Sequence, residues 1–264
     1  MVAGALTRNA PRLAPIRLGG ARFLLERNYM TNRRTWMIVF SGFFEPLFYL
    51  FSLGFGLGHF VGHVNGVAYA SFIAPALLAS SAMNGAVYDS TNVFWKLRYG
   101  RVYDAILATP VGPRDVAVGE VIWALLRGAL YSAAFLVLIS ALGLVHSAWA
   151  LLALPAAVLI GYSFAGLGVA GTTYMRTWQD FEILNLIQLP MFLFSATFYP
   201  ITVYPVAIQW FVRLTPLYHA IALLRALTSG HVGWLQLVNV AYLAVLGAIG
   251  VRLAGRRIHK LLLT

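Results

Sequence analysis

The apolar stretch from Ser195 to Arg225 constrains the fold more than any other part of the chain, because proline interrupts it three times. Pro200, Pro205 and Pro216 divide it into segments shorter than the about 20 apolar residues that a membrane-spanning helix requires. Broken backbone at membrane depth occurs only where protein or a water-filled cavity surrounds it. The sequence therefore predicts short helices that fold back into one face of a membrane-embedded bundle, a feature that indicates substrate passage rather than anchoring alone.

The composition indicates a membrane protein over nearly the whole length of the chain. The 264 residues are 60% hydrophobic and only 10% charged, whereas about 25% of a soluble domain is charged. We therefore expect an all-α polytopic membrane protein with no soluble catalytic domain. Cysteine is absent, which excludes disulfides and thiolate metal sites. The net charge of +11 lies mainly in segments that flank the apolar runs, so we expect membrane lipids, and not nucleic acid, among the partners.

Six apolar segments are long enough to be predicted as spans. They cover approximately residues 36–57, 69–93, 116–144, 148–174, 183–199 and 234–253. Sixteen of the 19 Lys and Arg residues fall in the segments on one side of these spans, and only Arg213 and Arg225 fall on the other. Because positive residues accumulate in cytoplasmic loops, both termini are predicted to be cytoplasmic.

This topology divides the chain into three parts. Residues 1–34 form a cytoplasmic tail and helix, residues 35–255 form the six-span domain, and residues 256–264 form a second cytoplasmic tail. The six-span domain includes a cytoplasmic loop at 95–115 and the re-entrant region at 200–228, which faces outward.

The segment 15–34 has the pattern of an interfacial helix. Its apolar stripe consists of Leu18, Ala21 and Leu25, and Arg22 and Glu26 share another face. A plain positively charged flank of the first span explains the same residues, so both interpretations stay open.

The loop 97–120 is the largest predicted cytoplasmic feature after the N-terminal tail. Residues 102–107 can form a short helix that Thr109, Pro110, Gly112 and Pro113 end, and Pro113, Arg114 and Asp115 can begin the next helix. Held parallel to the membrane, the short helix is expected to present Tyr103, Asp104, Ile106 and Leu107 to a docking partner. The alternative is a surface helix that rests on the lipid headgroups.

Ionisable residues within the spans are candidates for function, because charge inside a membrane is costly. Glu45, beside Pro46, either lines a substrate path, or is a protonated carboxyl bonded to a neighbouring helix, or pairs with Arg127. Glu120 and Arg127 lie seven residues apart on one helix, roughly 10 Å, which is too far for a direct pair. We expect each to have a separate partner in a structural charge network, with Asp89 and Glu45 as the candidates for Arg127.

Glycine and histidine carry weaker signals. The glycines at 54, 56, 58, 161, 166, 168 and 171 lack the lysine of a phosphate-binding loop and are predicted to allow close helix packing. His59 and His63 have a metal-like spacing but no third ligand nearby, so we expect no metal site. No Ser-His-Asp set, HExxH motif or intramembrane aspartate pair is present, and the chain is therefore not expected to be an enzyme.

The broken region also carries a resemblance to a known family. The order Ser195, Phe198, Pro200, Pro205, Trp210, Pro216, His219 and Arg225 resembles the signature of type-2 ABC exporter membrane subunits, and ILATPVGPRDVAVGE resembles their cytoplasmic coupling loop. The segments EPLFYLFSLGFGLG and YASFIAPALLASSAMNGAVYDS are similar to the branch that exports nodulation lipo-oligosaccharides and daunorubicin-type drugs. The resemblance extends over about residues 22–257.

The resemblance implies a multi-pass permease of the bacterial cytoplasmic membrane that pairs with a second copy or a related permease. Two cytosolic ATPase subunits would bind ATP and Mg and dock on the N-terminal helix and the coupling loop, so this chain would hold no cofactor. The implied coupling residues are Tyr103, Asp104, Ala105, Ile106, Leu107, Thr109, Pro110, Arg114 and Asp115. The implied outer gate contains Tyr199, Pro200, Pro216, His219 and Arg225.

A path for a cargo with a greasy body and a polar head requires aromatic walls with a few polar groups. Residues of both kinds are Glu45, Tyr49, Asn84, Tyr88, Asn185, Gln188 and Phe198. An amphipathic lipid, a glycolipid or a hydrophobic drug would suit them. The competing hypothesis is a gradient-driven secondary transporter or channel that uses Glu45 or Asp89, although no inverted repeat of the transporter kind is visible. A membrane enzyme acting on lipids is the weakest hypothesis, since it lacks a catalytic set.

Overall fold

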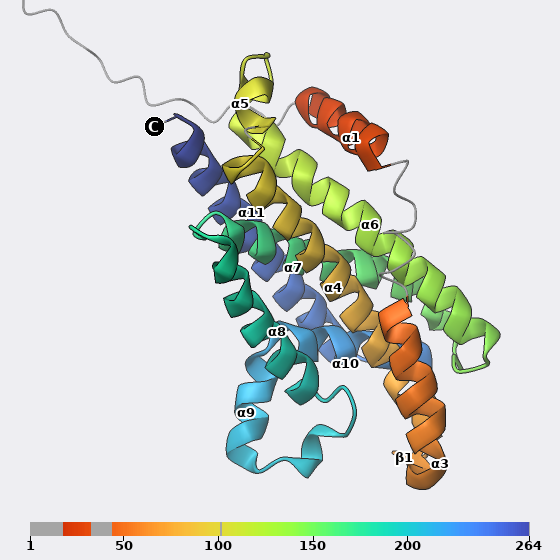
Figure 1. The fold of residues 1–264 in the computed structure, drawn as a ribbon. Coiled ribbons are helices and arrows are strands. Elements are labelled where there is room, and N and C mark those ends of the chain that lie inside the picture. Colours follow the sequence, from red (N-terminus) through yellow and green to blue (C-terminus); the bar gives the residue numbers. More distant parts are fainter. Residues whose placement is uncertain (1–17, 33–43, 101, 264) are drawn as a thin grey trace, which may run out of the picture.

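The computed structural model describes residues 18–32, 44–100 and 102–263, and almost all of this part of the chain is helical (Figure 1). The long helices run beside one another. Helices α1 (Leu18–Asn32) and α5 (Val102–Leu107) lie at one end of the bundle, which we call the α5 end. The opposite end, called the hairpin end, holds α3 (Gly58–Val61) and α9 (Val206–Leu214). Predictions for residues 1–17 and 33–43 lie outside the described residues.

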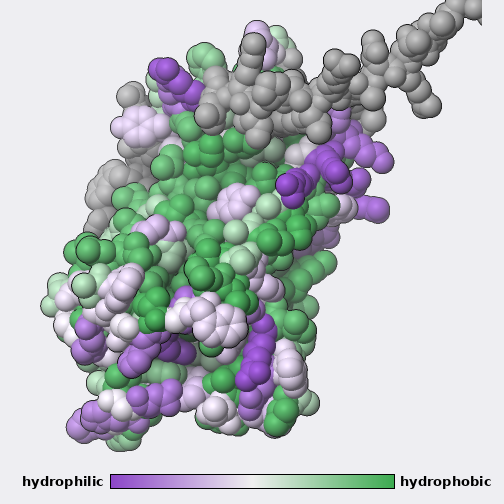
Figure 2. All heavy atoms as spheres, turned by 180° about the vertical axis from the view of Figure 1, so that it is seen from behind, coloured by the Kyte–Doolittle hydropathy of each residue, from purple (hydrophilic) through white to green (hydrophobic). Residues whose placement is uncertain are grey.

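Helix α4 (Tyr69–Arg98) forms the centre of the bundle. It packs against α6 (Pro113–Ala141) and α7 (Ala153–Thr172), and α7 in turn packs against α11 (Leu235–Leu263). Most of the apolar window of α4 is buried, whereas the other long helices keep much of their apolar surface exposed. Figure 2 shows the result on one face, where apolar side chains cover the middle and hydrophilic ones lie mostly toward the two ends. This is the surface of a protein whose outer side contacts lipid.

Five of the described helical segments are long and apolar enough to cross a membrane: Phe44–Val61, Tyr69–Leu97, Asp115–Ala141, Ala148–Thr172 and Leu235–Leu261. The all-α polytopic class is confirmed, but the count of six spans is not. The predicted fifth span is α8 (Phe181–Phe194), which has only 14 residues.

The fifth predicted span ends earlier than expected because the backbone leaves the helix after Phe194. Ala196 adopts a left-handed φ of 61°, which a continuing α-helix does not allow. The Thr197 hydroxyl donates to the Phe192 carbonyl at 2.6 Å and so satisfies one of the carbonyls at the helix end. The predicted extension to residue 199 is therefore wrong.

The first described span contains an irregularity that the sequence did not predict. After Phe44–Tyr49 the helix widens into the π-helix η1 (Leu50–Leu57) before α3. A two-stranded antiparallel hairpin follows, formed by β1 (His63–Val64) and β2 (Val67–Ala68). Asn65 and Gly66 make its turn with φ of 50° and 82°, the positive angles of the tightest hairpin turns. The predicted loop is thus a small piece of β-structure in an otherwise helical fold.

The re-entrant region consists of short helical pieces, as the prolines predict. They are η4 (Ile201–Val203), α9 and α10 (Pro216–Ser229). Pro216 is the first residue of α10, a position whose backbone N–H would make no hydrogen bond within the helix, so proline is tolerated there. Gly230 ends the helix with a left-handed φ of 85°. Helix α10 packs on α4 and α11, whereas Pro205 and most of α9 are exposed.

Glycine allows the close approach of α7 and α11. A Cβ atom at Gly250 would lie 2.5 Å from the carbonyl carbon of Gly166, and one at Gly247 would overlap the Tyr162 ring. A Cβ atom at Gly168 would meet the Ser90 hydroxyl of α4 at 2.8 Å. The predicted packing role is confirmed for Gly166 and Gly168. Gly247 and Gly250 of α11 contribute to the same close packing from the other side.

The remaining connections include the 3₁₀ turns η2 (Ala148–Leu152), which leads into α7, and η3 (Trp178–Asp180), which leads into α8. The backbone N–H groups of Arg176 and Thr177 donate to the Asp180 carboxylate and lower its pKa. At the C-terminal end, α11 continues to Leu263, so residues 256–263 extend the last helix.

Candidate functional site

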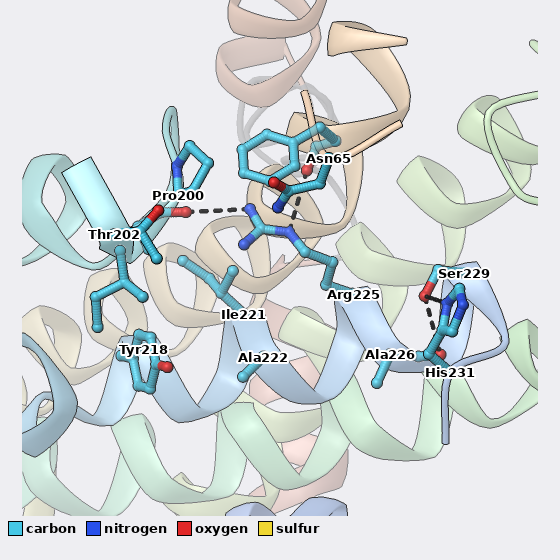
Figure 3. A pocket seen from close by; sticks show the side chains of 13 residues that line it. Asn65, Pro200, Thr202, Tyr218, Ile221, Ala222, Arg225, Ala226, Ser229 and His231 are labelled. Carbon is cyan, nitrogen blue, oxygen red and sulfur yellow. Dashed lines mark hydrogen bonds between the residues drawn. The ribbon is translucent and has the colours of Figure 1, made fainter. Parts of the chain in front are cut away.

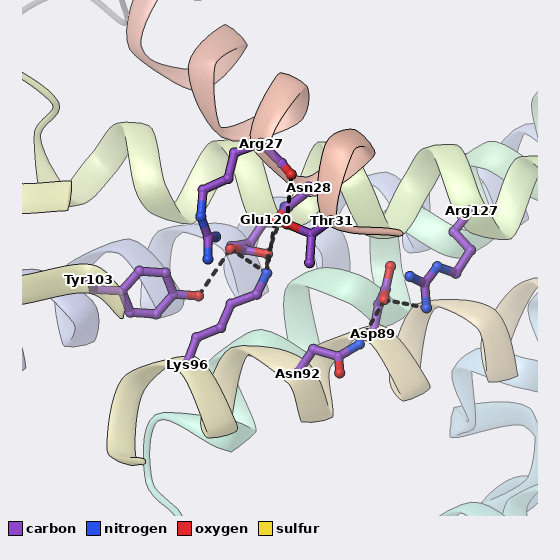
Figure 4. Close-up of polar contacts among 9 residues, drawn as sticks. All are labelled: Arg27, Asn28, Thr31, Asp89, Asn92, Lys96, Tyr103, Glu120 and Arg127. Atoms are coloured by element: carbon purple, nitrogen blue, oxygen red, sulfur yellow. Dashed lines mark hydrogen bonds and ion pairs between the residues drawn. The ribbon is translucent and has the colours of Figure 1, made fainter. Parts of the chain in front are cut away.

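A buried carboxylate connects four helices at the α5 end (Figure 4). Glu120 of α6 is 3% exposed. Both of its oxygens accept from Lys96 Nζ of α4, at 2.7 and 2.8 Å. The Tyr103 hydroxyl of α5 donates to Oε1 at 3.1 Å, and the Asn28 amide of α1 donates to Oε2 at 3.3 Å. Lys96 also donates to Asn28 Oδ1 at 3.1 Å. We call these four residues the Glu120 network.

The network places Tyr103 opposite to the predicted orientation. The ring is 1% exposed and directed into the protein, so it cannot form part of a docking face, and that prediction is wrong. A six-residue helix needs an anchor, and the phenol supplies one by combining apolar packing with a hydrogen bond to Glu120. Burial and the adjacent carboxylate raise the pKa of Tyr103 well above its usual value, and the phenol therefore stays a neutral donor at physiological pH.

The other predicted coupling residues are arranged around this anchor. Ala105, Thr109 and Pro110 are exposed, and Ile106 is half-buried against the core. Asp115 accepts from the Gly112 N–H at 3.1 Å, so it caps the start of α6. The structure describes the backbone at Asp104, Leu107 and Arg114 but not their side chains. The face that α5 leaves open is therefore the one that contains Ala105.

Helix α1 packs on α6 at the same end of the bundle. Ala21, Leu24 and Asn28 are buried, and Leu25 of the predicted stripe is half-buried. Gly119 of α6 makes room for Leu24, since a Cβ atom there would lie 2.9 Å from the leucine Cβ. Phe23 and Met30 remain exposed on the outer side of α1.

A second buried ion pair joins α4 and α6 deeper in the bundle. Arg127 Nη1 lies 2.9 Å from Asp89 Oδ1, and the two side chains are 11% and 3% exposed. Asn92 donates to the same Asp89 oxygen at 3.1 Å. The expectation of separate partners for Glu120 and Arg127 is confirmed, with Asp89 rather than Glu45 as the partner of Arg127. A buried pair of this kind is costly to break from one side, so it fixes α4 relative to α6.

A cleft of about 260 Å³ opens between the first span, α4 and α8. The structure brings six of the seven predicted substrate-path residues to it. They are Glu45, Tyr49, Asn84, Tyr88, Asn185 and Gln188, and Leu189 and Phe192 complete the lining. The seventh, Phe198, closes one edge by packing its ring against Tyr49 and Phe192.

The polar side chains of this cleft form a chain of hydrogen bonds. Gln188 Nε2 donates to Asn84 Oδ1 at 2.6 Å, and Asn84 Nδ2 donates to Glu45 Oε2 at 3.3 Å. The carboxyl of Glu45 is thus bonded to a neighbouring helix, as one of the open interpretations expected. The cleft combines an amide-and-carboxyl strip with aromatic walls, which is the arrangement that an amphipathic molecule requires.

The predicted outer-gate residues lie at the hairpin end but do not converge on one point. Tyr199 packs its ring against Tyr204, and His219 Nδ1 lies 2.7 Å from Asn239 Oδ1 of α11 with its ring stacked on Tyr242. Pro216 begins α10. Pro200 and Arg225 alone share a cavity.

Sequence reasoning did not single out Asn28 or Lys96, which hold Glu120, or Phe72, which stacks with Arg225. Lys96 was counted only as a loop charge. The position of Lys96 at the end of a predicted span could have indicated its role, because a buried acidic side chain on the next helix can reach a lysine there. Within the described residues, no cluster of three or more His, Cys, Asp or Glu is placed to hold a metal ion.

Comparison with known proteins agrees with this geometry. The family model for the ABC-2 type transporter matches residues 21–228, which include most of α1, the cleft, the Glu120 network and the re-entrant region at 200–228. The chain belongs to the ABC-2 type transporter family. It is therefore a membrane subunit of a transporter, and the resemblance noted from its sequence is confirmed.

Several relatives are similar over most of their length. Nodulation protein J of Rhizobium leguminosarum bv. trifolii is 35% identical over 78% of this chain and 80% of its own. Nodulation protein J of Rhizobium meliloti (strain 1021) is 33% identical over 79% and 82%. The inner membrane transport permease YadH of Escherichia coli (strain K12) is 25% identical over 66% and 68%. With its apolar helices, this membership makes the chain a multi-pass membrane protein.

Proposed function

We propose that this chain is the permease of an ATP-driven exporter that moves a lipid-like, glycolipid or hydrophobic drug cargo out of the bacterial cytoplasm or inner leaflet. The observation that carries the proposal is the Glu120 network. It connects a short surface helix to the ends of two spans and to α1 through one carboxylate. A force applied to α5 would therefore act on α1, α4 and α6 together.

On this proposal, two copies of a cytosolic ATPase dock on α1 and on the open side of α5, and they bind ATP and Mg. The exposed positions Ala105, Thr109 and Pro110 would contact the ATPase, while Tyr103 transmits its movement inward. Both termini would face the cytoplasm, in agreement with the basic residues at the α5 end. This chain would be the non-catalytic subunit.

The cleft between the first span, α4 and α8 is the proposed cargo path. Its lining is open on the surface of the single chain, and Tyr88 is 53% exposed. A second copy of the chain, or a related permease, would cover this side and enclose the path. Aromatic walls would contact the apolar body of the cargo, and the hydrogen-bond chain from Gln188 to Glu45 would bind its polar head.

The test is reconstitution of the chain with its candidate ATPase, recovered by affinity pull-down in mild detergent. We expect Asp104→Lys, or the bulky Ala105→Trp, to abolish ATPase binding and stimulation while membrane insertion stays normal. Arg213→Glu reverses an exposed charge at the opposite end and is the matched control. Normal stimulation and transport in both α5 variants would overturn the proposal.

A gradient-driven transporter is the second candidate, and the position of Glu45 in the cleft favours it over a membrane enzyme. It requires ion-coupled cargo flux in liposomes that contain the chain and no ATPase. Loss of that flux in Glu45→Gln would support it, whereas flux only after addition of ATPase and ATP would exclude it.

A further inference from the structure

The hairpin end contains a guanidinium with no carboxylate beside it. Arg225 of α10 stacks over the Phe72 ring, with its Cζ atom 3.9 Å from the ring centroid (Figure 3). Its Nε donates to the Phe72 carbonyl at 3.3 Å, and its Nη2 donates to the Ala196 carbonyl at 3.1 Å. These contacts hold the group in place but leave its positive charge without an anionic partner among the described residues.

The charge distribution of the chain makes this arrangement unusual. All eight Asp and Glu residues lie outside the segments 46–88, 121–179 and 183–264, which supply every connection at the hairpin end. No side chain from these segments can therefore neutralise Arg225. Ionisable groups at membrane depth ordinarily pair with each other or serve a ligand, and a guanidinium provides five N–H donors, of which two are used here.

Two cavities meet at this guanidinium. Their volumes are about 360 and 310 Å³, and Arg225 lines both. Asn65 of the hairpin turn and Ser229 and His231 at the end of α10 also line both. Figure 3 shows Asn65 beside the guanidinium, whereas Ser229 and His231 face each other further along the same cavity wall, with Ser229 Oγ 3.2 Å from His231 Nδ1. Apolar side chains such as Ile221 and Ala222 complete the wall of the larger cavity.

The geometry points to a binding site for the anionic phosphate or carboxylate head group of an amphiphile at this end of the protein. The fixed guanidinium would donate charge-assisted hydrogen bonds to the oxyanion, and the Asn65 amide would donate to a remaining oxygen. The apolar wall would contact the first carbons of the tail. This inference rests on the proposed export function, which would deliver the ligand to this end of the protein. The amphiphile is either the arriving cargo or a lipid of the outer leaflet.

The experiment uses the purified full chain in phosphatidylcholine nanodiscs without ATPase. The probes are short-chain phosphatidylglycerol, short-chain phosphatidylcholine and inorganic phosphate, and calorimetry measures their affinities. We expect phosphatidylglycerol to bind and Arg225→Gln to weaken its binding roughly tenfold or more, since a hydrogen bond to a charged group contributes about 1.5–3 kcal/mol. Arg213→Gln removes the other outward arginine and is expected to leave binding unchanged.

Arg225 also holds the Phe72 and Ala196 carbonyls, so its loss could disturb folding. Ala222→Leu fills the larger cavity without touching the guanidinium and is expected to weaken binding as well. Binding of inorganic phosphate would support a site that needs the head group alone, and binding of phosphatidylglycerol only would support one that needs the attached tail. Equal binding of phosphatidylcholine, or unchanged binding in both Arg225→Gln and Ala222→Leu, would overturn the proposal. Because no ATPase is present, this result is independent of the coupling test on Asp104.

Discussion

Replacing Tyr103 with phenylalanine tests whether α5 is attached through Glu120. The substitution keeps the buried ring and removes only the hydroxyl that donates to Glu120 at 3.1 Å. A hydrogen bond to a charged group contributes about 1.5–3 kcal/mol, so the equilibrium for local opening of α5 should rise about 10- to 100-fold. Glu120 keeps its bonds to Lys96 and Asn28, and the bundle should therefore lose little global stability.

Amide hydrogen exchange followed by mass spectrometry measures this opening directly in peptides that cover residues 102–109. Tyr103→Phe should lower protection there by the stated factor, leave the amides of α7 unchanged and reduce ATPase stimulation. Tyr99→Phe is the matched control, because Tyr99 is 60% exposed. Unchanged protection over 102–109, or an equal loss of protection throughout the bundle, would refute the view that Tyr103 anchors α5 locally.

The helix packing and the proposed topology and cargo path each lead to a further prediction. Gly250→Ala should lower the melting temperature of the protein markedly, because the new Cβ would lie 2.5 Å from the backbone of α7. Gly255→Ala is the control, since a Cβ there has no atom within 4 Å. Similar melting temperatures of the two variants would contradict the close packing of α7 and α11. Single cysteines at Val111 and Val203 should react with impermeant reagents from opposite sides of the membrane, and labelling from one side would contradict the assigned topology. Gln188→Leu should reduce cargo export severalfold but leave ATPase docking intact, as measured in proteoliposomes; unchanged export would remove the cleft from the path.

The sequence predicted those parts of the fold that depend on local chemistry. The prolines at 200, 205 and 216 disfavour a continuous helix, and the structure has short helices there. The polar residues of the cleft were recognised because polar groups are rare in spans, and the structure places them around one cavity. The Asn65-Gly66 dipeptide was an available signal for a hairpin, but the strong helical composition around it concealed the two short strands.

Other features depend on tertiary contacts that no local pattern specifies. A six-residue helix has no periodicity long enough to show which face is buried, so Tyr103 was assigned to the wrong side of α5. The end of α8 depends on the left-handed Ala196, whose carbonyl accepts from Arg225 on a helix far along the chain. The π-helix Leu50–Leu57 likewise forms in a span whose sequence reads as ordinary apolar helix.

The Glu120 network, the cleft and Arg225 differ in how fully the chain itself satisfies their polar groups. At the α5 end, Glu120 accepts on both oxygens from fixed donors, an arrangement suited to transmitting force rather than binding a ligand. In the cleft, the amides form a chain but still face an open cavity. At the hairpin end, Arg225 donates to two carbonyls and stacks on the Phe72 ring. Arg225 therefore keeps N–H donors available, and on the proposed orientation a cargo with an anionic head would gain interactions with them as it moves outward.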